Sequence, residues 1–124
     1  MLAGLLVALG GGIGAVTRYV VGGWFASRFG PAFPYGTFVI NVTGSFIIGV
    51  FLAFAQERTS LSPYWRLFFA VGFLGGYTTF SSFEYESIRL LQDQETLLGA
   101  VYLIGSVVTG GVAVFTGIVL GSWI

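Results

Sequence analysis

The stretch from Gly72 to Glu86 places hydroxyl and carboxylate side chains inside a long apolar segment. It begins with glycines, continues with a cluster of Thr and Ser, and ends with two carboxylates, Glu84 and Glu86. Glycines and clustered hydroxyl residues disfavour an uninterrupted helix, because the hydroxyls compete for backbone hydrogen bonds. A helix break within a membrane is tolerated where it is buried in protein or lines a watery cavity. The stretch is therefore a candidate ion or solute site.

Polar side chains also recur at helical spacing in three apolar segments, since residues three or four apart share one face of a helix. They are Thr37, Asn41 and Ser45; Thr79, Ser82 and Glu86; and Tyr102, Ser106, Thr109 and Thr116. One interpretation is hydrogen bonding between helices, which contributes about 0.6 kcal/mol per contact in membrane bundles. A single Ser or Thr favours that interpretation, whereas three such stripes in one small protein favour a hydrated track.

Asn41, Phe80 and Phe83 form a more specific group. An amide side chain in hydrocarbon needs a hydrogen-bond partner. At about 1.5 Å per residue, Asn41 lies about 7 Å from the middle of its helix, at a depth similar to the two phenylalanines. An amide NH₂ donates and an aromatic ring has a positive edge, so the group favours a small anion without a full charge that would trap it. Periodicity alone favours ordinary packing for the two rings.

Three ionisable residues fall inside the apolar segments: Arg18, Glu84 and Glu86. A charge at the centre of a bilayer costs about 2.5–3.5 kcal/mol on insertion scales. Arg18 lies past the middle of its segment, where it can reach towards the interface. The first and third helices run in the same direction, so we expect Arg18 and Glu86 to pair or to flank a vestibule.

The composition indicates whether these residues lie in a soluble protein or in a membrane protein. The chain has 124 residues, of which 56% are hydrophobic and 8% are charged, whereas about a quarter of a soluble domain is charged. We therefore expect an integral membrane protein. The absence of Cys and His excludes thiolate and imidazole metal sites and a Ser-His-Asp triad. With five basic and five acidic residues, no basic excess supports nucleic-acid binding.

Four apolar runs reach the length of about 20 residues that a membrane-spanning helix needs. They cover residues 2–26, 36–56, 65–91 and 97–124, and the third contains the break. The first run lacks a basic leader, so we interpret it as a helix rather than a signal peptide. The prediction is an all-α membrane protein with one domain, residues 1–124, and a broken third helix.

The arginines do not decide how these helices are oriented. Arg58 and Arg66 lie on one side of the predicted membrane, and Arg28 and Arg89 lie on the other. The positive-inside rule therefore favours neither orientation. Either weaker signals set one orientation, or the protein inserts both ways and pairs head to tail.

Glycine pairs at GxxxG spacing support tight association. They are Gly10 and Gly14, Gly72 and Gly76, and Gly117 and Gly121. The core of a four-helix protomer is filled by its own side chains, so we expect a conduit to form between subunits.

Two motifs resemble those of the Fluc/CrcB family of fluoride channels. They are GTFVINVTGSFIIG at 36–49 and GFLGGYTTFSSFEYE at 72–86, and GGGIGAVTRY at 10–19 is similar to the pattern of that family's first helix. The resemblance covers the chain from end to end. It implies passive fluoride export through the plasma membrane of a bacterium or archaeon. It also implies an antiparallel, dual-topology homodimer with two fluoride pores.

The resemblance implies roles for individual residues. Asn41 matches the family's pore asparagine, and Phe80 and Phe83 match its two pore phenylalanines. Gly75 and Thr78 match positions whose backbone carbonyls hold a central Na⁺ in the dimer. Oxygen ligands of this kind suit a hard cation.

Further positions follow the pore of the family or depart from it. Ser82 and Glu86 match polar positions along the pore, and Tyr102 and Ser106 fit a polar track on the last helix. Arg18 is interpreted as a structural charge. Two positions differ from many relatives: Gly110 stands where some have a hydroxyl, and Glu84 stands where many have Ser.

Two other functions remain as alternatives to a fluoride channel. A small multidrug transporter shares the size, the four helices and the dual topology, but needs a carboxylate in its first helix, and residues 2–26 contain none. A membrane assembly subunit without transport explains the glycines but not Asn41. No phosphate-binding loop indicates ATP use. We expect a channel and not an enzyme.

Overall fold

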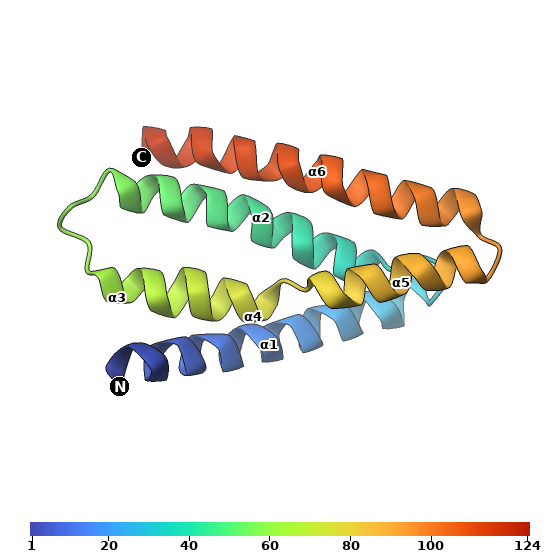
Figure 1. Cartoon of the computed structure of the whole chain (residues 1–124), viewed down its shortest axis with the longest axis horizontal. Helices are drawn as coiled ribbons and strands as arrows, with labels where there is room; N and C mark the ends of the chain where they lie inside the picture. The colour runs from blue at the N-terminus through green and yellow to red at the C-terminus, as the bar shows by residue number, and fades with distance from the viewer.

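The computed structural model describes residues 1–124 and is entirely helical (Figure 1). Three helices are long and apolar enough to cross a membrane: α1 (Leu2–Phe29), α2 (Tyr35–Gln56) and α6 (Thr96–Trp123). The predicted all-α membrane architecture is therefore confirmed. Both termini lie at the same end of the molecule as the α2–α3 loop (Figure 1), as an even number of spans requires.

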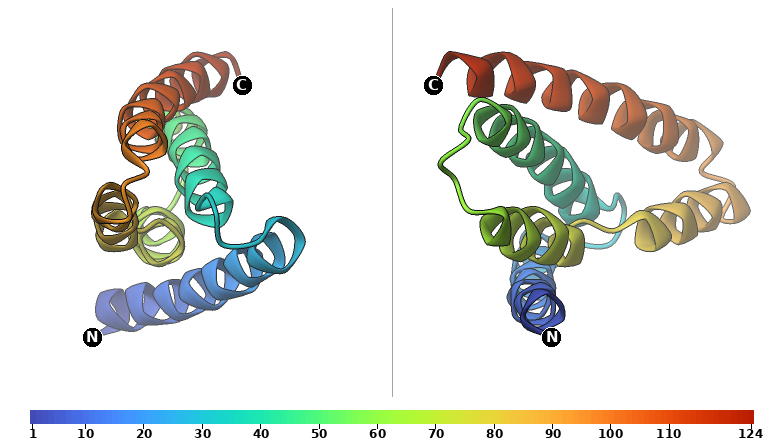
Figure 2. Two further views of the ribbon diagram at one scale, coloured as in Figure 1. Left: turned by 90° about the vertical axis from the view of Figure 1, so that its right-hand side faces the viewer. Right: turned by 60° about the vertical axis from the view of Figure 1, so that its left-hand side comes forward.

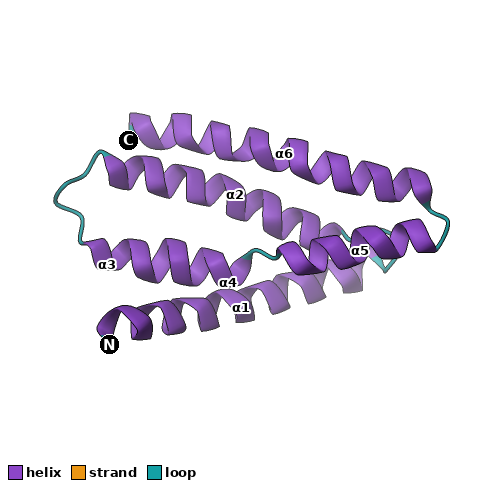
Figure 3. Cartoon of the chain, viewed as in Figure 1, coloured by secondary structure: helices purple, strands orange, loops and turns teal.

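The segment between α2 and α6 is the broken helix that the sequence predicts, and this prediction is also confirmed. It consists of α3 (Pro63–Trp65), η1 (Arg66–Leu74), α4 (Gly75–Tyr77) and α5 (Phe80–Gln92). Figure 3 shows the break as a short loop between α4 and α5. Thr78 and Thr79 there are extended, with φ/ψ of −79°/156° and −148°/113°. Thr79 is also the N-cap of α5, because its hydroxyl accepts a hydrogen bond from the Ser82 N–H.

The first half of the broken helix has a feature that the residue pattern does not predict. Its nine residues Arg66–Leu74 form a π-helix. π-helical turns are rare and frequently occur at functional sites. The apolar run RLFFAVGFL has no residue pattern that separates this geometry from an α-helix.

The glycine pairs allow close contacts between helices within the chain. A Cβ at Gly10 would overlap the Phe68 carbonyl oxygen, and one at Gly14 would overlap that of Phe73. Glycine therefore lets α1 pack backbone to backbone against the broken helix. Gly117 has the same role between α6 and Phe46 of α2. These spacings explain how the helices of one chain associate.

The helices are arranged with α1 and α6 on opposite sides and with α2 and the broken helix between them (Figures 1 and 2). The small core cluster of Ile40, Leu74 and Tyr77 joins α2 to the broken helix just before the break. Large apolar side chains are exposed along the outer faces of α1 and α6. The fold thus holds the break against α2 and presents apolar outer faces.

Candidate ion pathway at the helix break

A cavity of about 380 Å³ lies beside the break. Its lining comes from α2, the broken helix and α6, and it includes Asn41, Gly75, Thr78, Phe80, Phe83 and Ser106. The structure therefore brings together the amide and the two rings that the sequence places at one depth. No charged side chain lines this cavity. An ion here meets polar groups and aromatic rings rather than a counter-ion.

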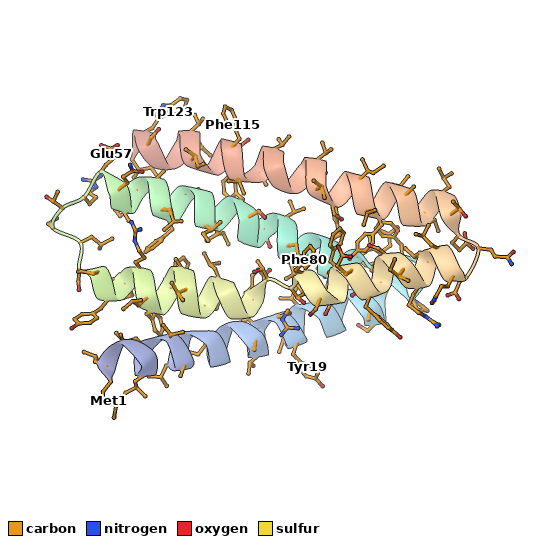
Figure 4. The ribbon with its side chains drawn as sticks, viewed as in Figure 1. Met1, Tyr19, Glu57, Phe80, Phe115 and Trp123 are labelled. Atoms are coloured by element: carbon orange, nitrogen blue, oxygen red, sulfur yellow. The ribbon has the colours of Figure 1, made fainter.

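The two phenylalanines differ in their surroundings. Phe83 is 6% exposed, whereas Phe80 is 73% exposed, and Figure 4 shows Phe80 beside the break at the start of α5. Their ring centroids are 6.1 Å apart and the rings are tilted by 54°. Phe83 also packs edge-on against Tyr102, with centroids 5.2 Å apart. The protomer thus fixes Phe83 and leaves Phe80 mostly uncovered.

Asn41 holds the backbone of the break. Its Nδ2 donates to the Thr79 carbonyl at 3.0 Å, and its Oδ1 accepts from the Thr79 N–H at 2.8 Å. The side chain thus replaces the helical partners that Thr79 lacks. An amide nitrogen has two hydrogens, so one N–H is left for the cavity. Nothing in the residue pattern indicates this backbone contact, because it depends on the extended conformation of Thr79.

The carbonyls of the break differ in their partners. The Leu74 oxygen accepts from both the N–H and the hydroxyl of Thr78, at 3.0 and 2.9 Å. The Thr78 oxygen accepts no hydrogen bond. The Thr79 N–H, which would reach the Gly75 oxygen in a continuous helix, turns to Asn41 instead. Of the two carbonyls that the resemblance assigns to Na⁺, that of Thr78 thus has no hydrogen-bond donor, and that of Gly75 lacks the Thr79 N–H that a continuous helix would supply.

Arg18 does not pair with Glu86, so this part of the prediction is wrong. Its Nε donates to the Gly76 carbonyl at 3.1 Å. The physical reason is the break, which removes the helical donor of that carbonyl and leaves it open to the guanidinium. The ion pair between Arg89 and Asp93, at 3.9 Å, lies outside the break.

Glu86 instead joins three helices through hydroxyl groups. Its two carboxylate oxygens accept from the Thr37 hydroxyl at 2.7 Å and from the Tyr102 hydroxyl at 3.2 Å. Glu86 and Thr37 line a cavity of about 310 Å³ near the α1–α2 turn. Arg18 lines another, of about 500 Å³, together with Thr37, Thr79 and Ser82. The two charges thus flank neighbouring cavities that share Thr37.

The polar track on α6 is only partly present. The Ser106 Oγ is buried without a hydrogen-bond partner and lines the cavity at the break. At Gly110 a Cβ would lie 3.7 Å from the Ser45 hydroxyl, so α2 supplies a hydroxyl where α6 lacks one. Thr116 is exposed and bonds to its own helix. Glu84 is exposed and lines none of the three cavities described.

One polar pair beside the break has no counterpart among the sequence predictions. The Tyr77 hydroxyl and the Thr43 Oγ1 are 2.9 Å apart and connect α4 to α2. Thr43 falls outside the polar stripe of its helix, and Tyr77 is one aromatic residue among many in the sequence. Only the packing of the two helices brings them together.

Membrane-length helices around a broken helix, with an uncharged polar cavity at the break, define a multi-pass membrane protein. Residues 5–118 match the family described as CrcB-like protein, Camphor Resistance (CrcB). The chain belongs to this family.

Curated relatives agree with that match over nearly their whole length. A protein of Acidobacterium capsulatum named Fluoride-specific ion channel FluC is 49% identical over 118 residues, which cover 95% of this chain and 94% of the relative. A protein of the same name from Chloroflexus aurantiacus is 50% identical over 119 residues, covering 96% and 94%. Another from Rhizobium meliloti is 48% identical over 116 residues, covering 94% and 93%.

Proposed function

We propose that this chain is a fluoride-selective channel through which fluoride leaves the cell passively. The names of its relatives support this function, and they describe a channel rather than an enzyme. The observation that carries the proposal is the cavity at the break. It combines the rings of Phe80 and Phe83 with a spare Asn41 N–H and the unpartnered Ser106 hydroxyl.

The chemistry of this cavity suits a small, strongly hydrated anion. Hydroxyl and amide donors replace part of the hydration shell, and the positive ring edges add a weak attraction. Conduction requires binding that is favourable enough for entry and weak enough for release. A cavity without a cationic side chain meets the second condition, because no full charge retains the ion.

The cavity beside Arg18 is proposed as the entry vestibule. The guanidinium uses its Nε on the Gly76 carbonyl, and its terminal nitrogens keep donors for an incoming anion. Thr79 and Ser82 line the same cavity. Thr79 also lines the cavity at the break, so one residue connects the vestibule with the proposed pore.

We propose that the working unit is an antiparallel homodimer of dual topology with two pores, embedded in the lipid bilayer. The balanced arginines of the two faces support insertion in both directions. The exposed ring of Phe80 supports a partner, because a pore residue that is 73% exposed in the protomer is not enclosed by its own chain. The apolar outer faces of α1 and α6 supply surface for both lipid and partner.

We also propose a structural Na⁺ at the centre of that dimer, held by the Gly75 and Thr78 carbonyls of both protomers. The fit is supported by the Thr78 oxygen, which has no hydrogen-bond donor, and by the Thr79 N–H, which turns away from Gly75. Carbonyl oxygens are the ligand type that hard cations take. A bound cation supplies positive charge that lowers the cost of an anion nearby.

Purified protein in liposomes tests the proposed function. A fluoride gradient with a permeant counter-ion should produce rapid electrogenic fluoride efflux, and an equal chloride gradient should produce none above empty liposomes. Proton-coupled exchange of organic cations would instead support a multidrug transporter. An absence of any flux, with folded protein in the membrane, would support an assembly subunit.

A further inference from the structure

Three residues of helix α2 contact the break or the residue just before it. Asn41 bonds to the backbone of Thr79, and Gly44 leaves the space that the Thr78 methyl group occupies. Between these two contacts, Thr43 meets the Tyr77 hydroxyl at 2.9 Å. This third contact has no place in the fluoride pathway described above, since neither residue lines the cavity at the break or the cavity of Arg18.

The direction of the third contact follows from counting hydrogens. A threonine hydroxyl has one hydrogen, and the Thr43 hydroxyl donates it to the Val39 carbonyl at 2.6 Å. Tyr77 is therefore the donor and Thr43 the acceptor. The hydrogen bonds run from the Tyr77 hydroxyl through Thr43 to the backbone of α2. Because that backbone belongs to a continuous helix, the Tyr77 hydroxyl has a rigid anchor.

Packing fixes the other end of the Tyr77 side chain. The residue is 8% exposed, and its ring stacks on Phe73 with centroids 5.9 Å apart and 9° between the planes. Phe73 stacks in turn on Phe69, at 5.5 Å and 7°. A ring held on its face by this stack and at its tip by Thr43 has little freedom to change rotamer. Tyr77 is the last helical residue before the break, so its backbone is fixed as well.

We propose that Tyr77 and Thr43 are positioning residues that set the direction of the break carbonyls. The inference rests on the proposed function, in which the Gly75 and Thr78 carbonyls hold Na⁺. Both carbonyls lie within two residues of Tyr77, because Gly75 begins the three-residue helix α4 and Thr78 follows it in extended conformation. Loss of the hydroxyl contact leaves the stacked ring in place but releases its tip, and the carbonyls then sample more orientations.

The test is the Na⁺ dependence of fluoride flux through the purified dimer in liposomes. Tyr77→Phe keeps the ring and its stack, and Thr43→Val keeps the shape of the side chain. Each should raise the Na⁺ concentration for half-maximal flux about threefold, which corresponds to the ~0.6 kcal/mol average of hydrogen bonds in membrane proteins. The double variant should show the same increase as either single variant, because both remove one contact. Flux at saturating Na⁺ should stay at the wild-type level.

Two further variants serve as controls. Thr43→Ser keeps the hydroxyl and should keep the wild-type Na⁺ response. If Tyr77→Phe fails to fold, the comparison of Thr43→Val with Thr43→Ser still tests the contact. Thr17→Val removes an exposed hydroxyl that bonds only to its own helix, and it should change nothing.

Several results would overturn the inference. They are a wild-type Na⁺ response in both single variants, additive effects in the double variant, or wild-type flux that is independent of Na⁺. A lower maximal flux with an unchanged half-maximal Na⁺ concentration also counts against it, because general loss of structure gives that result. Absence of fluoride flux in the wild type would instead refute the proposed function.

Discussion

Replacement of Asn41 by Leu should destabilise the helix break itself, independently of any effect on a bound ion. The Asn41 side chain satisfies both the N–H and the carbonyl of Thr79, at 2.8 and 3.0 Å. Leu has a similar size but no polar atom, so both backbone groups lose their partner. An unsatisfied donor or acceptor costs about 1–3 kcal/mol, which gives about 2–6 kcal/mol for the two groups. Both residues are half-buried, so we expect the lower part of this range.

Thermal denaturation of the purified protein in detergent, followed by size-exclusion chromatography, measures this effect. Asn41→Leu should lower the melting temperature clearly and should also abolish fluoride flux in liposomes. Ser45→Ala is the matched control for the melting temperature alone, because Ser45 lies one turn further along α2 in the same cavity lining and makes no hydrogen bond to the break. A wild-type melting temperature for Asn41→Leu would refute the reasoning, since the amide would then act on the ion alone.

The remaining predictions concern the pore, the vestibule and the helix contact of α1. Phe80→Ile should abolish fluoride flux and leave the dimer intact on size-exclusion chromatography, because Ile keeps an apolar side chain at this exposed position but has no aromatic ring. A normal flux would exclude a role for the ring. Ser106→Ala should reduce flux about tenfold or more, since a hydrogen bond to a charged group contributes about 1.5–3 kcal/mol. Unchanged flux would mean that the unpartnered Ser106 hydroxyl does not contact the ion. Arg18→Met leaves the break carbonyl that it binds unpaired, so it should lower both thermal stability and flux at low fluoride. Unchanged assembly and transport would exclude Arg18 from both roles. Gly14→Ala forces a Cβ onto the Phe73 carbonyl and should cost about 1–3 kcal/mol of stability, which a melting curve would show.

Several features of the fold can be predicted from the sequence because they depend on local composition. Apolar runs of sufficient length predict the spans, and the glycines with the Thr/Ser cluster predict a break within residues 72–86. The structure places it at Thr78 and Thr79. These signals act within a few residues of one another. The end of the first helix is less well predicted, since α1 continues past Ala26 to Phe29.

Other features depend on contacts between helices, which a single sequence does not display. The sequence predicts that Arg18 and Glu86 pair or flank a vestibule, but in the structure Arg18 donates to the Gly76 carbonyl at the break. The backbone contact of Asn41 and the Thr43–Tyr77 contact have the same origin, because each requires α2 to lie beside the break. The π-helical geometry of η1 also has no signal in the residue pattern.

Passage of fluoride at the helix break, by way of an uncharged cavity, is tested most directly by electrogenic flux from liposomes. Fluoride and chloride are compared in the wild type and in Phe80→Ile. We predict fast fluoride efflux, no chloride efflux, and loss of fluoride efflux in the variant. Equal passage of both halides, or a Phe80→Ile dimer that conducts fluoride like the wild type, would contradict this pathway.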